Sequence, residues 1–234
     1  MTTARDAKSK RTAVDDNIGN DTGYNKPRSS FGWKAPVGAA LVAVVLLVVA
    51  ILATRAKSPT KTTLRELGSI GVSGVALAPL PDPHASDPVV GLAGPSIVGS
   101  TFDRQIVSIK PGTSPTVLMF VAHWCPHCRR EVPKIVKWLK ASTPTEVDLF
   151  AVATATQSNL PNYPPSVWLT RESWPVKTIA DDTNGSATKA YGVSAFPFFV
   201  VFDTKGAVVE RVAGELTQQQ FTALFTAATT GKPA

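Results

Sequence analysis

The chain has 234 residues, of which 44% are hydrophobic, 18% are charged and only two are cysteines. Two cysteines are too few for a domain held together by several disulfides, or for a four-cysteine zinc or iron–sulfur site. The hydrophobic content excludes a wholly disordered chain. The formal net charge of +7 suggests nucleic acid or an anionic membrane as a partner, so its distribution along the chain matters.

Residues 1–34 form a basic segment. They contain seven lysines and arginines against four aspartates, few hydrophobic residues and many small polar ones. This composition predicts a disordered tail. The remaining 200 residues carry a net charge of only +4, which is typical of an ordinary protein surface, so we expect no nucleic-acid partner.

Residues 35–54 are 20 consecutive residues without a charge. As an α-helix they would span about 30 Å, the thickness of the hydrocarbon core of a membrane. The alternatives are a buried helix of a soluble domain and a cleaved signal peptide, but a signal peptide has a shorter apolar region and small residues at its cleavage site. We therefore expect a signal anchor that crosses the cytoplasmic membrane once. Basic residues flank both ends, so the positive-inside rule does not decide its orientation.

Residues 55–94 are rich in proline and glycine, which predicts a linker between the membrane and a folded domain. The domain itself is expected at residues 95–231, a normal size for a single hydrophobic core.

Within this domain, strand and helix patterns alternate. The apolar run Thr116–Ala122 predicts a central strand buried on both faces, and a helical period follows it. Further strands and helices are expected at residues 147–153 (strand), 166–172 (helix, inside a proline-rich insertion at 154–174), 176–180 (strand), 186–191 (helix), 198–202 and 207–212 (strands), and after Thr217 (helix). This order predicts an α/β fold with a mixed central sheet flanked by helices.

Cys125 and Cys128 lie in the segment HWCPHC, where the first strand ends and the helix begins. Two cysteines separated by two residues can form a redox-active disulfide, and we expect no other cofactor and no metal. The helix N-terminus stabilises a thiolate at Cys125, which is therefore the expected nucleophile, while Cys128 resolves the mixed disulfide. Pro126 is tolerated in the first helical turn. A protonated His127 would stabilise the thiolate further and make the disulfide more oxidising.

The segment Thr116–Pro133, TVLMFVAHWCPHCRREVP, resembles the active-site region of thioredoxin-fold proteins. The WCxxC motif followed by Arg129, Glu131 and Pro133 is most similar to the membrane-anchored redoxins of the TlpA and ResA type, and the similarity extends to about residue 225. This resemblance implies a thioredoxin-like fold and a thiol–disulfide oxidoreductase whose catalytic domain lies outside the cytoplasm.

The resemblance also implies roles for residues around the cysteines. Pro197 matches the cis-proline of the family and, with Phe196 and Trp124, is expected to shape the substrate groove. Met119 stands where thioredoxin and DsbA usually carry a buried acid, so Glu131 or a bound water is the expected proton-handling group.

The direction of electron transfer is open at this stage. The dipeptide Pro126-His127 is like that of DsbA-type oxidases, which favours an oxidant of protein thiols. The alternatives are a TlpA/ResA-like reductant acting on cytochrome c or metallochaperone thiols, and a non-catalytic metal-binding or adapter module. The expected partners are protein thiol or disulfide substrates, the membrane through residues 35–54, and a redox partner that recycles the cysteine pair. His123 lines the groove or lies on the surface.

Overall fold

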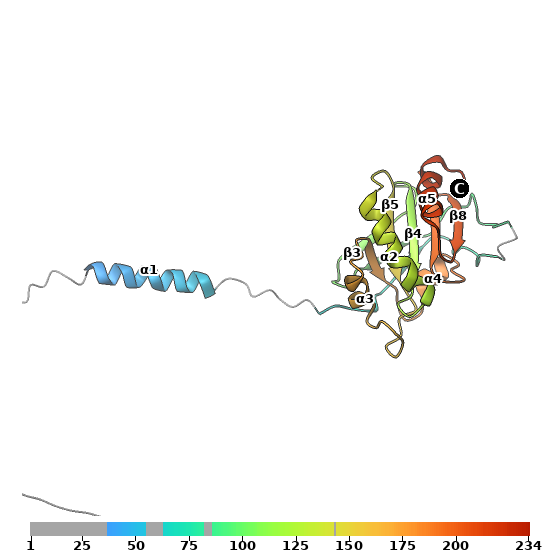
Figure 1. Ribbon diagram of the computed structural model, residues 1–234. Helices are drawn as coiled ribbons and strands as arrows, with labels where there is room; N and C mark the ends of the chain where they lie inside the picture. The colour runs from blue at the N-terminus through green and yellow to red at the C-terminus, as the bar shows by residue number, and fades with distance from the viewer. Residues whose placement is uncertain (1–36, 55–62, 82–85, 143) are drawn as a thin grey trace, which may run out of the picture. The chain divides into compact units, whose positions relative to one another are not determined.

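The computed structural model describes residues 37–54, 63–81, 86–142 and 144–234, which fall into two compact units, Met1–Thr60 and Lys61–Ala234. In the first unit the described residues form one helix, α1 (Val37–Thr54) (Figure 1). Within the described ranges no helix is both long and apolar enough to cross a membrane. The basic tail expected over residues 1–34 lies outside the described residues.

The second unit contains a central mixed sheet with the strand order β6-β5-β4-β7-β8. β4 (Thr116–Val121) lies in the middle and all six of its residues are buried, as the continuous apolar run predicts. β5 (Asp148–Ala153) pairs parallel with β4, and β6 (Lys177–Ala180) pairs parallel with β5. β7 (Phe198–Phe202) is antiparallel to β4, and β8 (Val208–Ala213) is antiparallel to β7.

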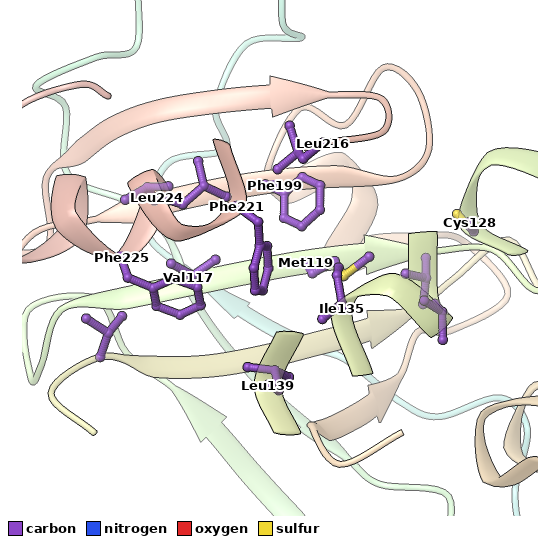
Figure 2. Packing of buried hydrophobic residues seen from close by; sticks show 14 of the residues in the cluster. Val117, Met119, Cys128, Ile135, Leu139, Phe199, Leu216, Phe221, Leu224 and Phe225 are labelled. Carbon is purple, nitrogen blue, oxygen red and sulfur yellow. The ribbon is translucent and has the colours of Figure 1, made fainter. Parts of the chain in front are cut away.

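Successive residues of β4 point to opposite faces of the sheet, and each face has its own core. On one face, Val117 and Met119 pack against α2 (Pro126–Ala141) and α5 (Gln218–Thr230) (Figure 2). The rings of Phe221 and Phe225 from α5 meet edge to face, with centroids 5.0 Å apart. Burying one such aromatic side chain stabilises the fold by about 1.5–3 kcal/mol.

The other face is covered by α4 (Ser186–Ala190) and a second sheet, with Leu118 and Phe120 of β4 facing this side. The second sheet is antiparallel, in the order β1 (Gly71–Ser73), β2 (Ser96–Ser100) and β3 (Ile106–Ile109). The sequence predicted neither β2 nor β3.

The sequence predicts a linker over residues 55–94. This prediction is wrong for residues 63–81 and 86–94, which belong to the folded unit. Leu77 and Val89 are almost fully buried in the second core. The carboxylate of Asp87 lies 2.7 Å from the guanidinium of Arg211 on β8, whose side chain is fully buried. Residues 63–81 and 86–94 show no helical or strand-like spacing of apolar residues, but single apolar side chains such as Leu77 and Val89 pack into the core of the second unit.

The remaining helices and strands agree with their expected positions within a few residues. The insertion contains α3 (Pro165–Arg171). Thr217 caps α5 through a hydrogen bond from the backbone N–H of Gln220, whose side chain in turn accepts from the backbone N–H of Thr217. The α/β fold with a mixed sheet flanked by helices is confirmed.

Candidate functional site

Cys125 and Cys128 lie at the carboxyl end of β4, at the first turn of α2. Cys125 occupies the N-cap position in extended conformation (φ −68°, ψ 123°), and Pro126 follows in the first turn. Both cysteines are free thiols, and Cys125 is 6% exposed whereas Cys128 is fully buried. The sulfur of Cys125 is therefore the accessible one, and it lies at the positive end of the α2 dipole.

The thiol of Cys128 is held in the protonated form. Burial is the main cause that raises the pKa of Cys128, and the neighbouring Cys125 and Glu131 raise it further. The backbone N–H of Ala122, 3.5 Å from the sulfur, acts in the opposite direction. A resolving thiol in this environment needs a group that removes its proton when it reacts.

The residues expected in the substrate groove gather around Cys125. Its thiol donates to the carbonyl oxygen of Phe196 at 3.4 Å, and the Phe196–Pro197 peptide bond is cis, as the family resemblance predicts. Trp124 donates from Nε1 to Ala155 O at 2.8 Å, and its ring meets that of Phe196 edge to face with centroids 6.2 Å apart. The Tyr163–Pro164 bond is also cis, which the sequence did not predict.

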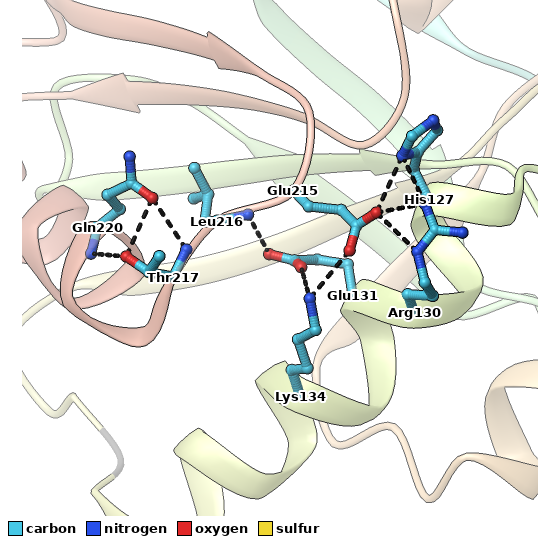
Figure 3. A network of polar contacts seen from close by, with 8 residues as sticks. All are labelled: His127, Arg130, Glu131, Lys134, Glu215, Leu216, Thr217 and Gln220. Carbon is cyan, nitrogen blue, oxygen red and sulfur yellow. Dashed lines mark hydrogen bonds and ion pairs between the residues drawn. The ribbon is translucent and has the colours of Figure 1, made fainter.

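Glu131 is a fully buried carboxyl group on the second turn of α2. Its Oε1 accepts from the backbone N–H of Leu216 at 2.9 Å, and its Oε2 lies 3.5 Å from Lys134 Nζ (Figure 3). Burial raises the pKa of Glu131, while the Leu216 N–H and Lys134 lower it. The acid therefore holds its proton at a higher pH than an exposed glutamate, which suits the role predicted for it.

Glu215 joins His127 to two further cations of α2 on the surface. Its Oε1 lies 2.9 Å from His127 Nδ1 and accepts from Arg130 Nη2 at 2.6 Å, and its Oε2 accepts from Lys134 Nζ at 2.9 Å (Figure 3). Arg130 Nη2 also lies 2.9 Å from His127 Nδ1. The hydrogen bonds from Arg130 and Lys134, and then that from His127, lower the pKa of Glu215 to about 2. The sequence did not point to Glu215, because it lies 88 positions after His127 in a loop with no motif of its own.

His123 neither lines the groove nor lies on the surface, because it is 1% exposed. Its Nδ1 lies 2.7 Å from the carbonyl oxygen of Pro161, and its Nε2 lies 3.2 Å from the backbone N–H of Gln157. The carbonyl requires a donor and the N–H requires an acceptor, so the ring is neutral with its proton on Nδ1. Asn162 Nδ2 also donates to the His123 carbonyl, so His123 holds the insertion against the cysteine segment.

In the described part of the chain, no three His, Cys, Asp or Glu side chains are grouped so that they could hold a metal ion.

Comparisons with known proteins agree with this geometry. The chain is 29% identical over 165 residues to a thiol:disulfide interchange protein DsbE homolog of Paracoccus denitrificans, covering 68% of this chain and 85% of the relative. It is 24% identical over 121 residues to sporulation thiol-disulfide oxidoreductase A of Bacillus subtilis, covering 51% and 72%. A putative thiol:disulfide interchange protein DsbE from Chlorobium tepidum shares the fold, with a TM-score of 0.51, 19% identity and coverage of 59% and 96%.

The Redoxin family model matches residues 104–226, which is more than half of the chain and includes both cysteines. With the thioredoxin-like fold and the cysteine pair at the start of α2, this match shows that the chain belongs to the Redoxin family and is a thiol–disulfide oxidoreductase.

Proposed function

We propose that the chain reduces protein disulfides, with Cys125 as the nucleophile and Cys128 as the resolving thiol. The observation that carries this proposal is the difference between the two sulfurs. Cys125 is partly accessible, at a helix N-terminus and beside the cis-proline loop, whereas Cys128 is fully buried behind it.

In the proposed reaction, the Cys125 thiolate attacks one sulfur of the substrate disulfide and the other substrate sulfur leaves as a thiolate. Cys128 then loses its proton to Glu131 and attacks the sulfur of Cys125. The second substrate thiolate is released, the Cys125–Cys128 disulfide forms, and two electrons have passed to the substrate. A dithiol protein or a small thiol must return the enzyme to its reduced state.

The reductive direction is supported by two carboxylates near the thiols. The Glu131 carboxylate raises the pKa of Cys128, and Glu215 compensates the charge of a protonated His127. The first effect disfavours the Cys128 thiolate and the second reduces the net positive charge at His127. A reduced dithiol that is less stabilised by ionisation gives up its electrons more readily, so it is a better reductant. The relatives from Paracoccus denitrificans and Bacillus subtilis are named for disulfide interchange and thiol–disulfide oxidoreduction, which fits this chemistry.

Oxidation of protein thiols is the second candidate, favoured by the Pro126-His127 dipeptide alone. Equilibration of the full chain with glutathione and with thioredoxin distinguishes the two. A reduction potential near that of thioredoxin, about −270 mV, supports the reductant, and a value near that of DsbA, about −120 mV, overturns it.

Catalysis itself is tested by insulin reduction. Cys125→Ser should abolish the activity, and Cys128→Ser should accumulate a mixed disulfide with the substrate through Cys125. Activity that survives Cys125→Ser would refute the catalytic proposal. The remaining alternative would then be an adapter or metal-binding module, and a metal titration of the reduced protein would test it.

We further propose that residues 35–54 tether the domain to the cytoplasmic membrane and that the domain faces outward. The support is the absence of any charge over these 20 residues. Recovery of the full-length chain in the membrane fraction, with its domain accessible to protease added outside, is the expected result. A soluble, shortened chain would overturn the tether.

A further inference from the structure

A cavity of about 350 Å³ lies at the first turn of α2, the turn that carries the cysteine pair, although neither cysteine lines it. One wall is the first turn of α2, with Pro126, Arg129 and Arg130. The opposite wall comes from the insertion, with Asn162, Trp168, Arg171 and Glu172. Pro126 directly follows Cys125 in the chain, so the cavity adjoins the helical turn that carries the reactive cysteine.

The residues that line the cavity are rich in positive charge, since they include three arginines and only one carboxylate, that of Glu172. Arg130 is paired with Glu215 outside the cavity. Arg171 donates to Asn162 at 2.9 Å, but its contacts with Glu172 are long, at 3.4 Å. The guanidinium of Arg129 has no hydrogen bond or ion pair with any described residue, so the cavity has a free donor for an anion.

The insertion wall is firmly attached to the active-site segment. Asn162 donates to the carbonyl of His123 and accepts from Arg171, so one side chain links the residue before the WCxxC motif to a cation of the cavity. Trp168 is 1% exposed and belongs to the core beside α2. The Arg171 side chain is exposed, but its hydrogen bond to Asn162 restricts it, which lowers the entropy cost of binding.

We propose that this pocket binds an acidic side chain of the protein substrate, close in sequence to the cysteine that Cys125 attacks. Guanidinium groups bind carboxylates through paired, charge-assisted hydrogen bonds, and the volume suits one or two side chains. The insertion between β5 and β6, which contains α3, thereby acquires a role in substrate selection. This inference rests on the proposed function, because it assumes that the substrate of Cys125 is a polypeptide.

The test compares two synthetic peptides that each carry one disulfide and differ only beside one cysteine, where one has Asp and Glu and the other has Asn and Gln. The full chain should reduce the acidic peptide with a kcat/KM about fivefold higher at low salt. The preference should decrease as the ionic strength increases. An effect of the arginines on the reactivity of Cys125 would change both rates equally and would cancel in this ratio.

Three variants link the preference to the pocket. Arg129→Gln combined with Arg171→Gln should bring the ratio close to one, whereas Glu172→Gln removes the competing carboxylate and should increase it. Lys110→Gln removes an exposed charge outside the pocket and should leave the ratio at the wild-type value. Misfolding cannot explain a lower ratio of the two kcat/KM values in the double arginine variant together with a higher ratio in Glu172→Gln.

The outcomes separate this inference from the proposed function. Equal reduction of both peptides by the wild-type chain, or an unchanged ratio in the double arginine variant, overturns the pocket and leaves the oxidoreductase intact. Failure to reduce either peptide, together with failure to reduce insulin, contradicts the proposed function itself.

Discussion

His127 Nδ1 lies 2.9 Å from Glu215 Oε1, although the two residues are 88 positions apart in the sequence. The residue of the CPHC motif whose positive charge would favour a thiolate is thus paired with a carboxylate from the loop between β8 and α5. The local charge at His127 therefore depends on Glu215 and on its neighbours Arg130 and Lys134, and not on the motif alone.

The first prediction is that Glu215→Gln makes the protein more oxidising. The amide still accepts hydrogen bonds, but it no longer compensates the cations beside Cys125, so the reduced dithiol is stabilised. The equilibrium constant with glutathione should shift toward the reduced protein by about threefold to tenfold, which corresponds to about 15–30 mV. Glu146→Gln, which removes an exposed carboxylate just beyond the other end of α2, is the control, and an equal shift in it would contradict the prediction.

The second prediction concerns stability in acid. The pKa of Glu215 is about 2 in the folded protein and near 4.5 in the unfolded chain, so its stabilising contribution is complete above pH 4.5 and is lost as the pH falls toward 2. Glu215→Gln should be less stable than the wild type at neutral pH, and the two should converge near pH 2. Urea unfolding at several pH values measures this, and a constant difference across the range would be the opposing result.

The third prediction is that Glu131→Gln lowers the pKa of Cys128. The Glu131 carboxylate raises that pKa, although burial is the larger cause. In a Cys125→Ser background, alkylation of Cys128 should begin at lower pH when Glu131 is replaced. With both cysteines present, the resolving step at neutral pH should slow, because the proton acceptor is lost.

Glu210→Gln is the matched control for Glu131. Glu210 lies on β8 and burial also raises its pKa, but it contacts neither cysteine among the described interactions. The role proposed for Glu131 fails if resolution is equally fast in Glu131→Gln and in the wild type.

The fourth prediction is that Asp87→Ala destabilises the domain by about 3–5 kcal/mol, because it leaves the fully buried Arg211 without its carboxylate partner. Arg211 Nη1 would keep only the carbonyls of Ala78 and Tyr191. Chemical denaturation of the full chain measures the loss, and amide exchange should increase in β1. Asp103→Ala, at an exposed turn, should change stability by less than about 0.5 kcal/mol. Equal effects of the two substitutions would argue against a structural role of the Asp87–Arg211 pair.

Much of the α/β core was predictable because its signals are local. The apolar run of β4 and the helical period of α2 each bury a continuous face, and such patterns are specific. The position of the cysteine pair between them followed from the same two elements. Thr217 was recognised as a helix cap because its side chain acts on a backbone N–H only three residues away.

The parts that were missed depend on contacts between distant segments. β2 and β3 are five and four residues long, too short for a clear alternation, and they are stable because they pair with one another and cover the sheet. The segment after residue 63 resembled a linker in composition, but the buried Arg211 holds it through Asp87. The sequence predicts His123 in the groove or on the surface, but its ring is buried against the insertion, where it contacts the carbonyl of Pro161 and the backbone N–H of Gln157.

The sequence by itself determined that two cysteines three positions apart, at the junction of a buried strand and a helix, form one reactive pair in an α/β domain. Both conclusions depend only on neighbouring residues and on the periodic spacing of hydrophobic residues along the chain. Only the tertiary structure decided what surrounds that pair: the carboxylates of Glu131 and Glu215, the carbonyl of Phe196, and the arginine pocket made with the insertion. Electrostatic and hydrogen-bond effects on a thiol act through space over a few ångströms, and the residues that exert them here lie as many as 90 positions away along the chain.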